Sequence, residues 1–301
     1  MKNFKIFSGT ANLPLAEKIG KILKTPLGKI EIVRFADSEV RVRIEEEVRE
    51  KICFVIASLS NPVDTHLVEF CLSVDALKQN NAQKIIGVIP YFGYARQDKA
   101  HRPGEGVSAR VMAKLIEAVG VDKIITFDLH SEAVASFFNV PLIHLFGLSV
   151  FLPKIKRLKD DLVIIAPDAG GVKRAQKFAQ DLNAPLALIE KKRDLEKIHT
   201  LEVLEVIGKV SNKTCCLVDE VITGGGTVVG AAKLLKEKGA RKVIACATHA
   251  DFVEGTAEKL TKSEIDKVYV SDTILLPPDK IFPKLEIVSI GNLIARTIKD
   301  L

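Results

Sequence analysis

The chain has 301 residues, 47% of them hydrophobic and 27% charged, with a formal net charge of +6 and five cysteines. This length and composition indicate a globular protein with two domains, each able to bury its own core. No apolar run approaches the roughly 18 residues of a membrane span, and Met1–Ile6 lacks the apolar stretch and cleavage site of a signal peptide. We therefore expect a cytoplasmic protein with no membrane partner, whose cysteines are small buried hydrophobes in a reducing compartment.

The surplus of positive charge does not indicate a nucleic-acid partner. Lysines and arginines are scattered along the chain, as in Lys154–Lys159, which has the pattern of the solvated end of a helix. The chain has three tyrosines and no tryptophan, which argues against an aromatic platform for bases. We interpret the charge as a modest field that collects small anionic substrates.

Apolar runs of strand length alternate with amphipathic stretches of helical period along nearly the whole chain. Apolar strands separated by helices predict an α/β fold with mainly parallel sheets covered on both faces. The expected strands are 4–7, 30–33, 52–57, 85–89, 124–127, 142–145, 163–166, 186–189, 203–207, 215–218, 243–247, 268–270 and 287–290. The expected helices are 15–23, 65–79, 108–119, 172–182, 228–238 and 253–260.

The strand and helix pattern runs twice, which predicts a duplicated α/β unit. Ile85–Pro90 resembles Val163–Pro167, and Ile124–His130 resembles Val243–His249. We place the seam between the two copies near residues 145–150.

This seam predicts one domain over residues 1–146 and a second over residues 147–289. A C-terminal helix, 290–301, is expected to pack back on the first domain. In open α/β sheets, ligands bind beyond the carboxyl ends of the strands. The functional residues should therefore follow strands.

The most informative segment is Cys215–Thr227. It joins four apolar strand residues to Asp219 and Glu220, and then to a glycine-rich turn that opens into a helix. Such a turn directs several backbone N–H groups and the positive end of a helix at one point, which suits a phosphate. The carboxylates suit sugar hydroxyls or a cation, so the segment predicts a site for a phosphorylated sugar. The plainer alternative is an ordinary strand–turn–helix, although three successive glycines cost backbone entropy. The turn consists of Thr223, Gly224, Gly225, Gly226 and Thr227.

Two further strand ends carry side chains that could bind a cation. Asp168 follows the strand 163–166 in a second glycine-rich turn and suits a sugar hydroxyl or Mg²⁺, or else it caps the next helix. Asp128 and His130 end another strand and, while that strand continues, share a face from which a metal or phosphate is within reach. The plainer alternative there is a capping Asp128 and a packed His130.

Two more segments combine cations with other polar or aromatic groups. In Pro90–Lys99, two tyrosines and a phenylalanine accompany Arg96 and Gln97, which suits a nucleotide with the arginine on its phosphates. The alternative is a surface loop anchored by its aromatic side chains. Glu190–Asp194 carries three cations and is expected to begin a polar loop, ending near His199, that closes over a polyphosphate. The alternative is a solvated run of charge.

Taken together, these segments make the chain resemble the ribose-phosphate diphosphokinases, also called phosphoribosyl pyrophosphate (PRPP) synthases. The resemblance implies two tandem phosphoribosyltransferase-like domains. It also implies Mg²⁺-dependent transfer of the β,γ-diphosphoryl group of ATP to the anomeric hydroxyl of ribose 5-phosphate, giving PRPP and AMP for nucleotide biosynthesis. The matching segments span nearly the full length and are 35–39, 90–98, 128–130, 167–171, 191–193 and 219–227.

The resemblance implies roles for residues on the ribose 5-phosphate side. Asp219 and Glu220 would hold the ribose hydroxyls, and the turn 223–227 would hold the 5-phosphate. Lys191 and Arg193 would stabilise charge on the transferring group, and Arg193 would also contact ribose 5-phosphate.

On the ATP side, the resemblance implies that His130 and Asp168 bind Mg²⁺ and that Arg96 and Gln97 contact ATP. The adenine site of this family is supplied by a neighbouring subunit, so we expect a homo-oligomer. The adenine-site residues here would be Phe35, Asp37, Ser38 and Glu39.

The chain departs from the family pattern at Thr223, where an acid is usual, and at Glu220, where aspartate is usual. A catalytic base at the position of that missing acid is therefore not expected. One alternative is a phosphoribosyltransferase, which consumes PRPP, but Phe35–Glu39 and Arg96-Gln97 have a role only if ATP binds. The other is a catalytically silent relative, which should have lost the cationic segment or the metal ligands.

Overall fold

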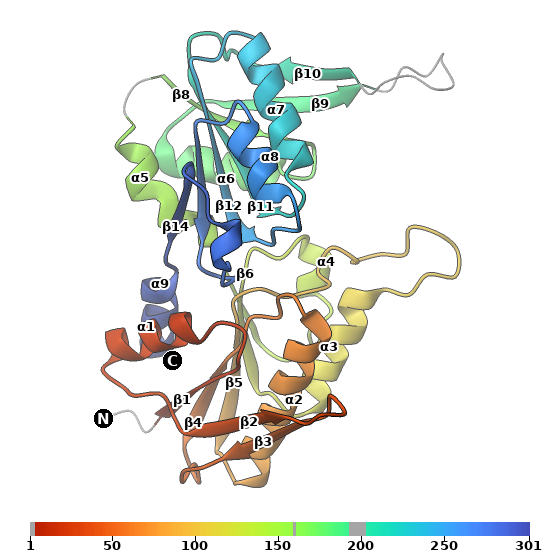
Figure 1. Cartoon of the computed structure of the whole chain (residues 1–301), viewed down its shortest axis with the longest axis vertical. Coiled ribbons are helices and arrows are strands. Elements are labelled where there is room, and N and C mark those ends of the chain that lie inside the picture. Colours follow the sequence, from red (N-terminus) through yellow and green to blue (C-terminus); the bar gives the residue numbers. More distant parts are fainter. Residues whose placement is uncertain (1–3, 159–160, 193–202) are drawn as a thin grey trace. The chain divides into compact units, whose positions relative to one another are not determined.

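The computed structural model describes residues 4–158, 161–192 and 203–301. The chain forms two compact units, and each is a mainly parallel sheet flanked by helices (Figure 1). Unit 1 comprises residues 1–147, 273–275 and 289–301, and unit 2 comprises residues 148–272 and 276–288. In the described part of the chain, no helix is both long enough and apolar enough to cross a bilayer.

The sheet of unit 1 has the strand order β1-β4-β5-β6-β7, and all neighbours are parallel. Its strands are β1 (Phe4–Ser8), β4 (Ile52–Ile56), β5 (Lys84–Ile89), β6 (Lys123–Phe127) and β7 (Leu142–Leu145). Its helices are α1 (Leu13–Leu23), α2 (Val63–Gln79), α3 (Ser108–Ala118), α4 (Glu132–Ala135) and the C-terminal α9 (Gly291–Asp300), which packs against α1.

A separate antiparallel pair, β2 (Ile30–Arg34) and β3 (Val40–Ile44), also belongs to unit 1. The sequence analysis missed β3. Its residues alternate valine or isoleucine with arginine, which is the period of a half-buried strand. The arginines interrupted the apolar runs that were used to find strands.

The sheet of unit 2 has the order β10-β9-β8-β11-β12-β13-β14, and only β10 and β9 pair antiparallel. Its strands are β8 (Leu162–Ala166), β9 (Leu186–Lys192), β10 (Val203–Ile207), β11 (Thr214–Ile222), β12 (Lys242–Ala250), β13 (Lys267–Ser271) and β14 (Leu285–Val288). The accompanying helices are the 3-10 helices η1 (Gly147–Phe151) and η2 (Pro278–Lys280) with α5 (Leu152–Lys156), α6 (Val172–Leu182), α7 (Gly226–Glu237) and α8 (Thr256–Lys262).

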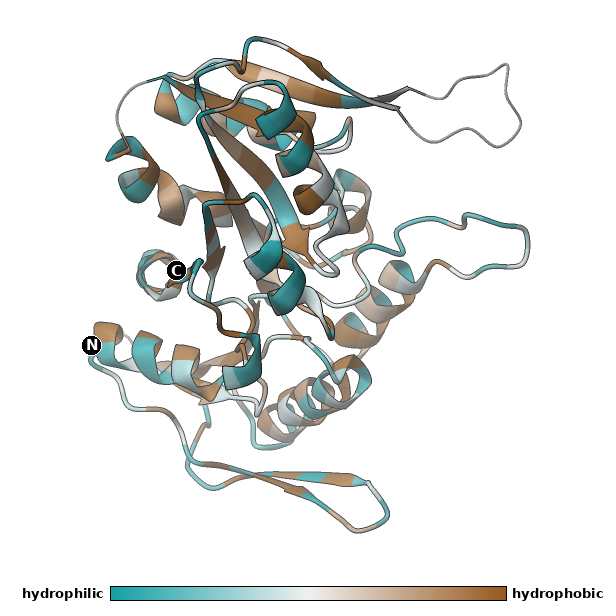
Figure 2. Cartoon of the chain, turned by 45° about the horizontal axis from the view of Figure 1, so that its top comes forward, coloured by the Kyte–Doolittle hydropathy of each residue, from teal (hydrophilic) through white to brown (hydrophobic). Residues whose placement is uncertain are grey.

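The central strands are apolar on both faces because helices cover both. In Figure 2 the strands are mostly brown, while the helices carry teal on one side. The core of unit 1 includes Phe7 and Phe70, and that of unit 2 includes Leu217 and Leu235, all of them buried. This pattern is typical of parallel sheets buried on both faces.

The duplication expected from the sequence is present, but the segments matched in the sequence were wrong. The order β1-β4-β5-β6-β7 of unit 1 recurs as β8-β11-β12-β13-β14 in unit 2. By position in the sheet, β5 therefore corresponds to β12 rather than β8, and β6 corresponds to β13 rather than β12. Short apolar strands resemble one another in sequence, so their similarity does not identify the equivalent strand.

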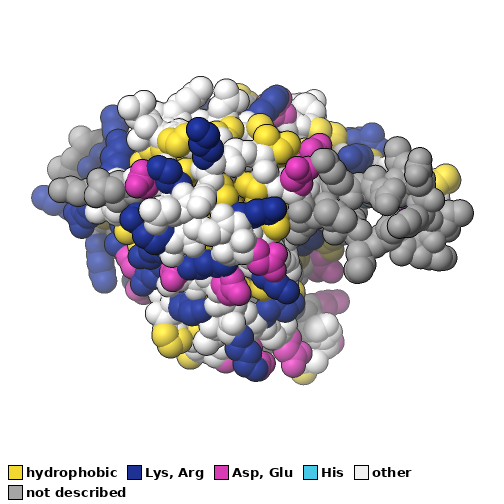
Figure 3. All heavy atoms as spheres, turned by 90° about the horizontal axis from the view of Figure 1, so that it is seen from above, with side chains coloured by type: hydrophobic (Ala, Val, Ile, Leu, Met, Phe, Trp, Pro, Cys, Tyr) yellow, Lys and Arg dark blue, Asp and Glu magenta, His cyan; other side chains and the backbone are white. Residues whose placement is uncertain are grey.

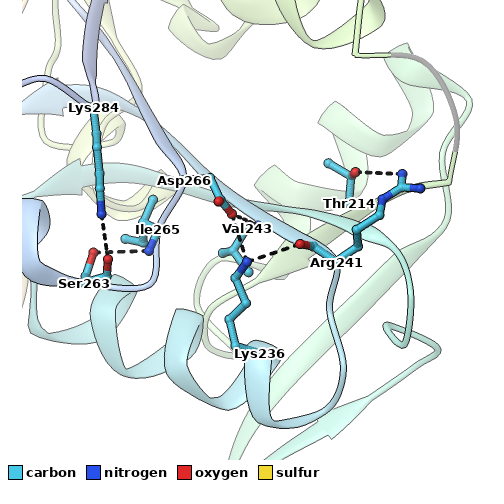
Figure 4. A network of polar contacts seen from close by, with 8 residues as sticks. All are labelled: Thr214, Lys236, Arg241, Val243, Ser263, Ile265, Asp266 and Lys284. Carbon is cyan, nitrogen blue, oxygen red and sulfur yellow. Dashed lines mark hydrogen bonds and ion pairs between the residues drawn. The ribbon is translucent and has the colours of Figure 1, made fainter.

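Hydrogen bonds at the amino ends of the strands support this alignment of the two units. Asp122 accepts from the Ile85 N–H at 2.7 Å, and its own N–H donates to the Ile85 carbonyl at 2.8 Å. Asp266 repeats both bonds with Val243, each at 2.7 Å. Asp266 also accepts a hydrogen bond from Lys236 Nζ at 3.1 Å (Figure 4). These bonds hold the end of the sheet that lies opposite the carboxyl ends of the strands.

Candidate functional site

The acidic pair lies inside β11 rather than after it, because the strand continues to Ile222 instead of ending at Val218. β11 pairs with β12 as far as Ile222, but its pairing with β8 stops at Leu217. Beyond that point, no strand among the described residues pairs with the edge of β11 that faces β8. Asp219 and Glu220 stand at this opening.

Arg174 of α6 lies at this opening and pairs with both carboxyl groups. Its Nη1 lies 2.6 Å from Glu220 Oε2 and 3.6 Å from Asp219 Oδ1. The exposed fraction of the side chain is 13% for Arg174, 8% for Glu220 and 19% for Asp219. Charges this well buried require a partner. Arg174 therefore belongs to the candidate site.

The sequence analysis missed Arg174. Val172–Leu182 was identified as an amphipathic helix, but none of its charged residues was singled out. The available signal is the spacing from Arg174 to Phe178, which is buried. Residues four apart share a helix face, so this spacing places Arg174 on the face that packs against the sheet.

Burial and the neighbouring Glu220 raise the pKa of Asp219 to about 9, against the lowering effect of Arg174. The shift of the Asp219 pKa is toward the neutral, protonated carboxyl group. The Glu220 N–H also donates to Asp219 Oδ1 at 2.8 Å, which holds the carboxyl group in place. A protonated carboxyl group can donate as well as accept, and a sugar hydroxyl can do both.

We expect the raised pKa of Asp219 to appear in the pH dependence of stability. Between about pH 4 and pH 9 the unfolded chain has released this proton and the folded chain has not, so rising pH favours unfolding. Relative to Asp219→Asn, the wild type should lose free energy of unfolding as pH rises. Urea unfolding at several pH values measures this, with the exposed Asp181→Asn as control. A constant difference between wild type and Asp219→Asn would contradict the expectation.

In the glycine-rich turn, one glycine has a backbone conformation that favours glycine, and the other two have no neighbouring atoms where a side chain would stand. Gly225 has φ +72°, a conformation that favours glycine. A Cβ added at Gly224 or Gly226 would meet no atom within 4 Å. Tight packing therefore does not explain these two glycines, and the arrangement favours a ligand over a purely structural turn.

Backbone donors at this turn are available to a ligand. Helix α7 begins at Gly226, and the first N–H groups of a helix have no partner within it. Among the described residues, no acceptor is recorded for the N–H groups of Gly226, Thr227 and Val228. They lie at the positive end of a helix dipole, which suits an anion.

The internal repeat places the acidic pair in unit 2 only. The N–H of Gln83 binds the carbonyl of Lys51, and that of Arg241 binds the carbonyl of Lys213 in the same way, both at 2.9 Å. Counting from these equivalent lysines, Ala57-Ser58 of unit 1 stands where unit 2 has Asp219 and Glu220. Of these two equivalent positions, therefore, the one in unit 2 carries the carboxyl pair.

Asp168 lies between β8 and α6, at the same edge of the unit 2 sheet as Asp219, because β8 and β11 are adjacent and parallel. Its Oδ1 accepts from the Gly171 N–H at 3.0 Å, which stabilises the turn. No partner is recorded for its second oxygen among the described residues, and the side chain is half-buried. One oxygen thus supports the turn while the other is available to a ligand.

The expectation that Asp128 and His130 share a strand face was wrong, because β6 ends at Phe127. Asp128 is buried, has φ +27°, and accepts from the Gly147 N–H at 2.9 Å, so it anchors the start of η1. His130 is exposed. In the described ranges no three His, Cys, Asp or Glu side chains gather in a way that could hold a metal ion. His130 belongs to unit 1 and Asp168 to unit 2.

In unit 1, the loop with Arg96 and Gln97 lies next to the His130 segment. Asp98 Oδ2 accepts from the Ser131 hydroxyl at 2.6 Å and joins the two segments. Arg96 and Gln97 are exposed, whereas Tyr91 and Phe92 are buried. These two rings therefore anchor the loop, while the third, Tyr94, is half-buried and its hydroxyl group donates to Asp64.

The segment Phe35–Glu39 is the turn between β2 and β3. It is closed by the Phe35 N–H, which donates to the Glu39 carbonyl at 2.8 Å. Arg34 Nη1 donates to the Ser38 carbonyl at 2.7 Å, and Arg34 Nη2 reaches the buried Glu69 of α2 at 3.3 Å. The Phe35 side chain is 43% exposed, with the Arg41 guanidinium 5.6 Å from its ring centre. The turn thus exposes an aromatic ring, and the hydrogen bonds of Arg34 hold the turn in place.

The cationic segment begins in a strand and not in a loop, which corrects the expectation for Glu190–Lys192. β9 runs through Lys192, and β10 pairs with it from Val203 opposite Lys192. Because β10 provides hydrogen-bond partners for the backbone groups of these residues, the strand continues past the apolar run. Arg193 and the remainder of the expected loop lie outside the described residues.

The surface in Figure 3 bears on the expectation about nucleic acids. On this face, outside the grey atoms, Lys and Arg side chains are interspersed with Asp and Glu. A continuous basic stripe, the feature that tracks a nucleic-acid backbone, is not visible on this one face outside the grey atoms.

Comparison with known proteins agrees with the two-unit architecture. Residues 4–120 match the N-terminal domain of ribose phosphate pyrophosphokinase, and residues 198–301 match the phosphoribosyl synthetase-associated domain. Ribose-phosphate pyrophosphokinase 1 of Streptococcus pyogenes serotype M1 is 40% identical over 299 residues, which are 98% of this chain and 93% of that protein. The ribose-phosphate pyrophosphokinase of Thermosipho africanus is 41% identical over 297 residues, with the same coverage.

A solved structure extends the likeness to the fold. The crystal structure of phosphoribosylpyrophosphate synthetase from Mycobacterium smegmatis matches with a TM-score of 0.93 and 36% identity, covering 99% of this chain and 98% of that chain. The fold and the turn at the end of β11 define a protein with two tandem phosphoribosyltransferase-like domains. More specifically, the chain belongs to the ribose-phosphate pyrophosphokinase family of enzymes.

Proposed function

We propose that this chain makes PRPP by transferring the β,γ-diphosphoryl group of ATP to the anomeric hydroxyl of ribose 5-phosphate, releasing AMP. The observation that carries the proposal is the combination, at one strand end of unit 2, of an open glycine turn with a buried acidic pair. A phosphate and a set of sugar hydroxyls are the ligand groups that require both. The names of the relatives support the same reaction.

Unit 2 holds ribose 5-phosphate in this proposal. The N–H groups of Gly224, Gly225, Gly226 and Thr227 surround the 5-phosphate, together with the Thr223 and Thr227 side chains. Asp219 and Glu220, balanced by Arg174, take the ribose hydroxyls. The reaction has little need of a nucleophilic side chain, since the anomeric hydroxyl attacks directly. Fixing the sugar at two points lowers the entropic part of the barrier.

ATP binds through unit 1, with Arg96 and Gln97 on its phosphates. The adenine contacts come from Phe35, Asp37, Ser38 and Glu39 of a neighbouring subunit. The exposed ring of Phe35 and the bracing of its turn by Arg34 support such a role. We therefore propose a homo-oligomer that acts on small molecules in the cytoplasm, with no nucleic-acid or membrane partner.

Charge neutralisation is the remaining requirement of diphosphoryl transfer. Mg²⁺ bound to ATP would supply part of it. The available oxygen of Asp168 fits this ion, which prefers oxygen ligands, and the imidazole of His130 is a less favoured donor for it. Lys191 and Arg193 supply positive charge to the transferring group.

An assay of AMP release tests the proposal. Purified protein with ATP, Mg²⁺ and ribose 5-phosphate should form AMP and PRPP in equal amounts, and omission of ribose 5-phosphate or addition of a chelator should stop the reaction. Consumption of PRPP with a nucleobase, without AMP formation from ATP, would favour a phosphoribosyltransferase. Binding of both substrates without turnover would favour a silent relative.

We expect Asp219→Ala to raise the KM for ribose 5-phosphate about 5-fold or more, since leaving a buried hydrogen-bonding group without its partner costs about 1–3 kcal/mol. The value of kcat should change less. Asp219→Asn imitates the protonated acid and should lose less binding than the alanine variant. Steady-state kinetics measures both, and an unchanged KM in Asp219→Ala would remove this carboxyl group from the sugar site.

A further inference from the structure

Helix α8 lies directly behind the glycine-rich turn and binds two of its carbonyl groups. The Thr256 hydroxyl donates to the Thr223 carbonyl at 2.7 Å, and Lys259 Nζ donates to the Gly224 carbonyl at 2.9 Å. Leu260 supports Gly225, with its Cδ2 3.5 Å from where a Cβ would stand. These three α8 residues are spaced i, i+3 and i+4, so they lie on one face of the helix.

The two hydrogen bonds from α8, together with a longer one from the Val253 N–H to the Thr223 carbonyl at 3.4 Å, restrict where the backbone N–H groups of the turn point. In a planar trans peptide the C=O and the following N–H point in opposite directions. With the carbonyls of Thr223 and Gly224 held toward α8, the N–H groups of Gly224 and Gly225 point away from it. In the described residues neither N–H has a recorded acceptor.

A turn of three glycines needs such a restraint. Glycine adopts both signs of φ with little cost, so a peptide that is followed by a glycine, as those after Thr223 and Gly224 are, rotates more easily than others. If such a peptide rotated, its carbonyl oxygen would face the phosphate in place of its N–H group. The carbonyl oxygen would then repel the phosphate, whereas the N–H group attracts it. Thr256 is 1% exposed, so its hydroxyl is a fixed donor that opposes this rotation. The exposed Lys259 adds a positive charge on the carbonyl side, which strengthens the paired N–H as a donor.

We propose that Thr256 and Lys259 are positioning residues that orient the N–H groups of Gly224 and Gly225 toward the 5-phosphate of the bound sugar. The inference rests on the proposed function, because it takes ribose 5-phosphate as the ligand of the turn. Neither side chain contacts the phosphate in this proposal. Both act from behind, through carbonyl groups, and so they affect substrate affinity more than the chemical step.

Calorimetric titration of the full-length protein with ribose 5-phosphate, in the absence of ATP, tests the proposal. Thr256→Val keeps the shape of threonine without the hydroxyl and should weaken affinity about 10-fold, the size of one lost hydrogen bond to an ionic ligand network. Thr256→Ser retains the hydroxyl and should restore most of the affinity. Lys259→Met should weaken affinity about 3-fold. Lys262→Met is the matched control, because Lys262 lies on α8 but pairs with Glu258 at the surface.

Steady-state kinetics should show a raised KM for ribose 5-phosphate with kcat changed little in Thr256→Val and Lys259→Met. If wild-type protein does not bind ribose 5-phosphate, the proposed function itself fails. If wild type binds and both variants bind equally well, with unchanged Tm, the positioning role is overturned. Should Thr256→Val not fold, Lys259→Met decides alone, since an exposed lysine leaves no void in the core.

Discussion

Gly226→Ala is expected to weaken ribose 5-phosphate binding about 10- to 200-fold while leaving the protein at least as stable as the wild type. An added methyl group in a tight ligand site costs about 1–3 kcal/mol of binding. The protein itself has room for it, since a Cβ at Gly226 would meet no atom within 4 Å. Gly226 is the first residue of α7, and alanine is the better helix former by up to about 1 kcal/mol. Calorimetry and urea unfolding measure the two effects separately.

Gly230→Ala provides a matched control for this variant. Gly230 lies one turn further along α7, and a Cβ there also meets nothing within 4 Å. This variant should gain stability and bind ribose 5-phosphate as the wild type does. Weakened binding of ribose 5-phosphate in Gly226→Ala together with normal binding in Gly230→Ala would place the ligand at the start of α7. Full binding by Gly226→Ala would mean that the turn does not hold the phosphate.

Lys191→Ala is expected to lower kcat by about 10³-fold or more, the range found when a cation that stabilises a transferring phosphoryl group is removed. The affinity for ribose 5-phosphate should be nearly unchanged, because an interaction made only in the transition state does not contribute to substrate binding. Lys191 is held in β9 opposite Leu204 of β10, so its backbone position is defined by sheet pairing. Single-turnover kinetics with calorimetry separates the two quantities.

Lys192→Ala is the control for the lysine substitution. It removes the same charge from the adjacent residue of β9, for which the family resemblance implies no role. If both substitutions lower kcat alike, the effect is one of general charge and not of a specific transition-state contact. Normal turnover in Lys191→Ala would exclude that residue from the mechanism.

Local patterns were sufficient for most of the helices and strands. The helix predicted over Val172–Leu182 has those bounds in the structure, and the segment Cys215–Thr227 forms the strand, turn and helix expected of it. The period of apolar residues and the conformational freedom of glycine act over a few residues. A short stretch of sequence is therefore enough to predict a structural feature that depends on these two properties.

Strand ends and strand equivalence depended on partners distant in sequence. β11 continues through Asp219 and Glu220 because β12 continues beside it, and β9 continues through two lysines because β10 pairs with them. A charged residue in the sequence suggests that a strand has ended, but the backbone hydrogen bonds of a neighbour can extend it. For the same reason, only sheet order shows that β5 is equivalent to β12.

By itself the sequence determined the α/β class, the internal duplication and the phosphate-type turn after an acidic pair. Only the tertiary structure identified Arg174 as the partner of that pair, and Thr256 and Lys259 as the residues behind the turn. The physical reason is that propensity and periodicity are properties of neighbouring residues. Burial of charge and the orientation of peptide groups instead depend on which helices the packed sheet brings against that strand end.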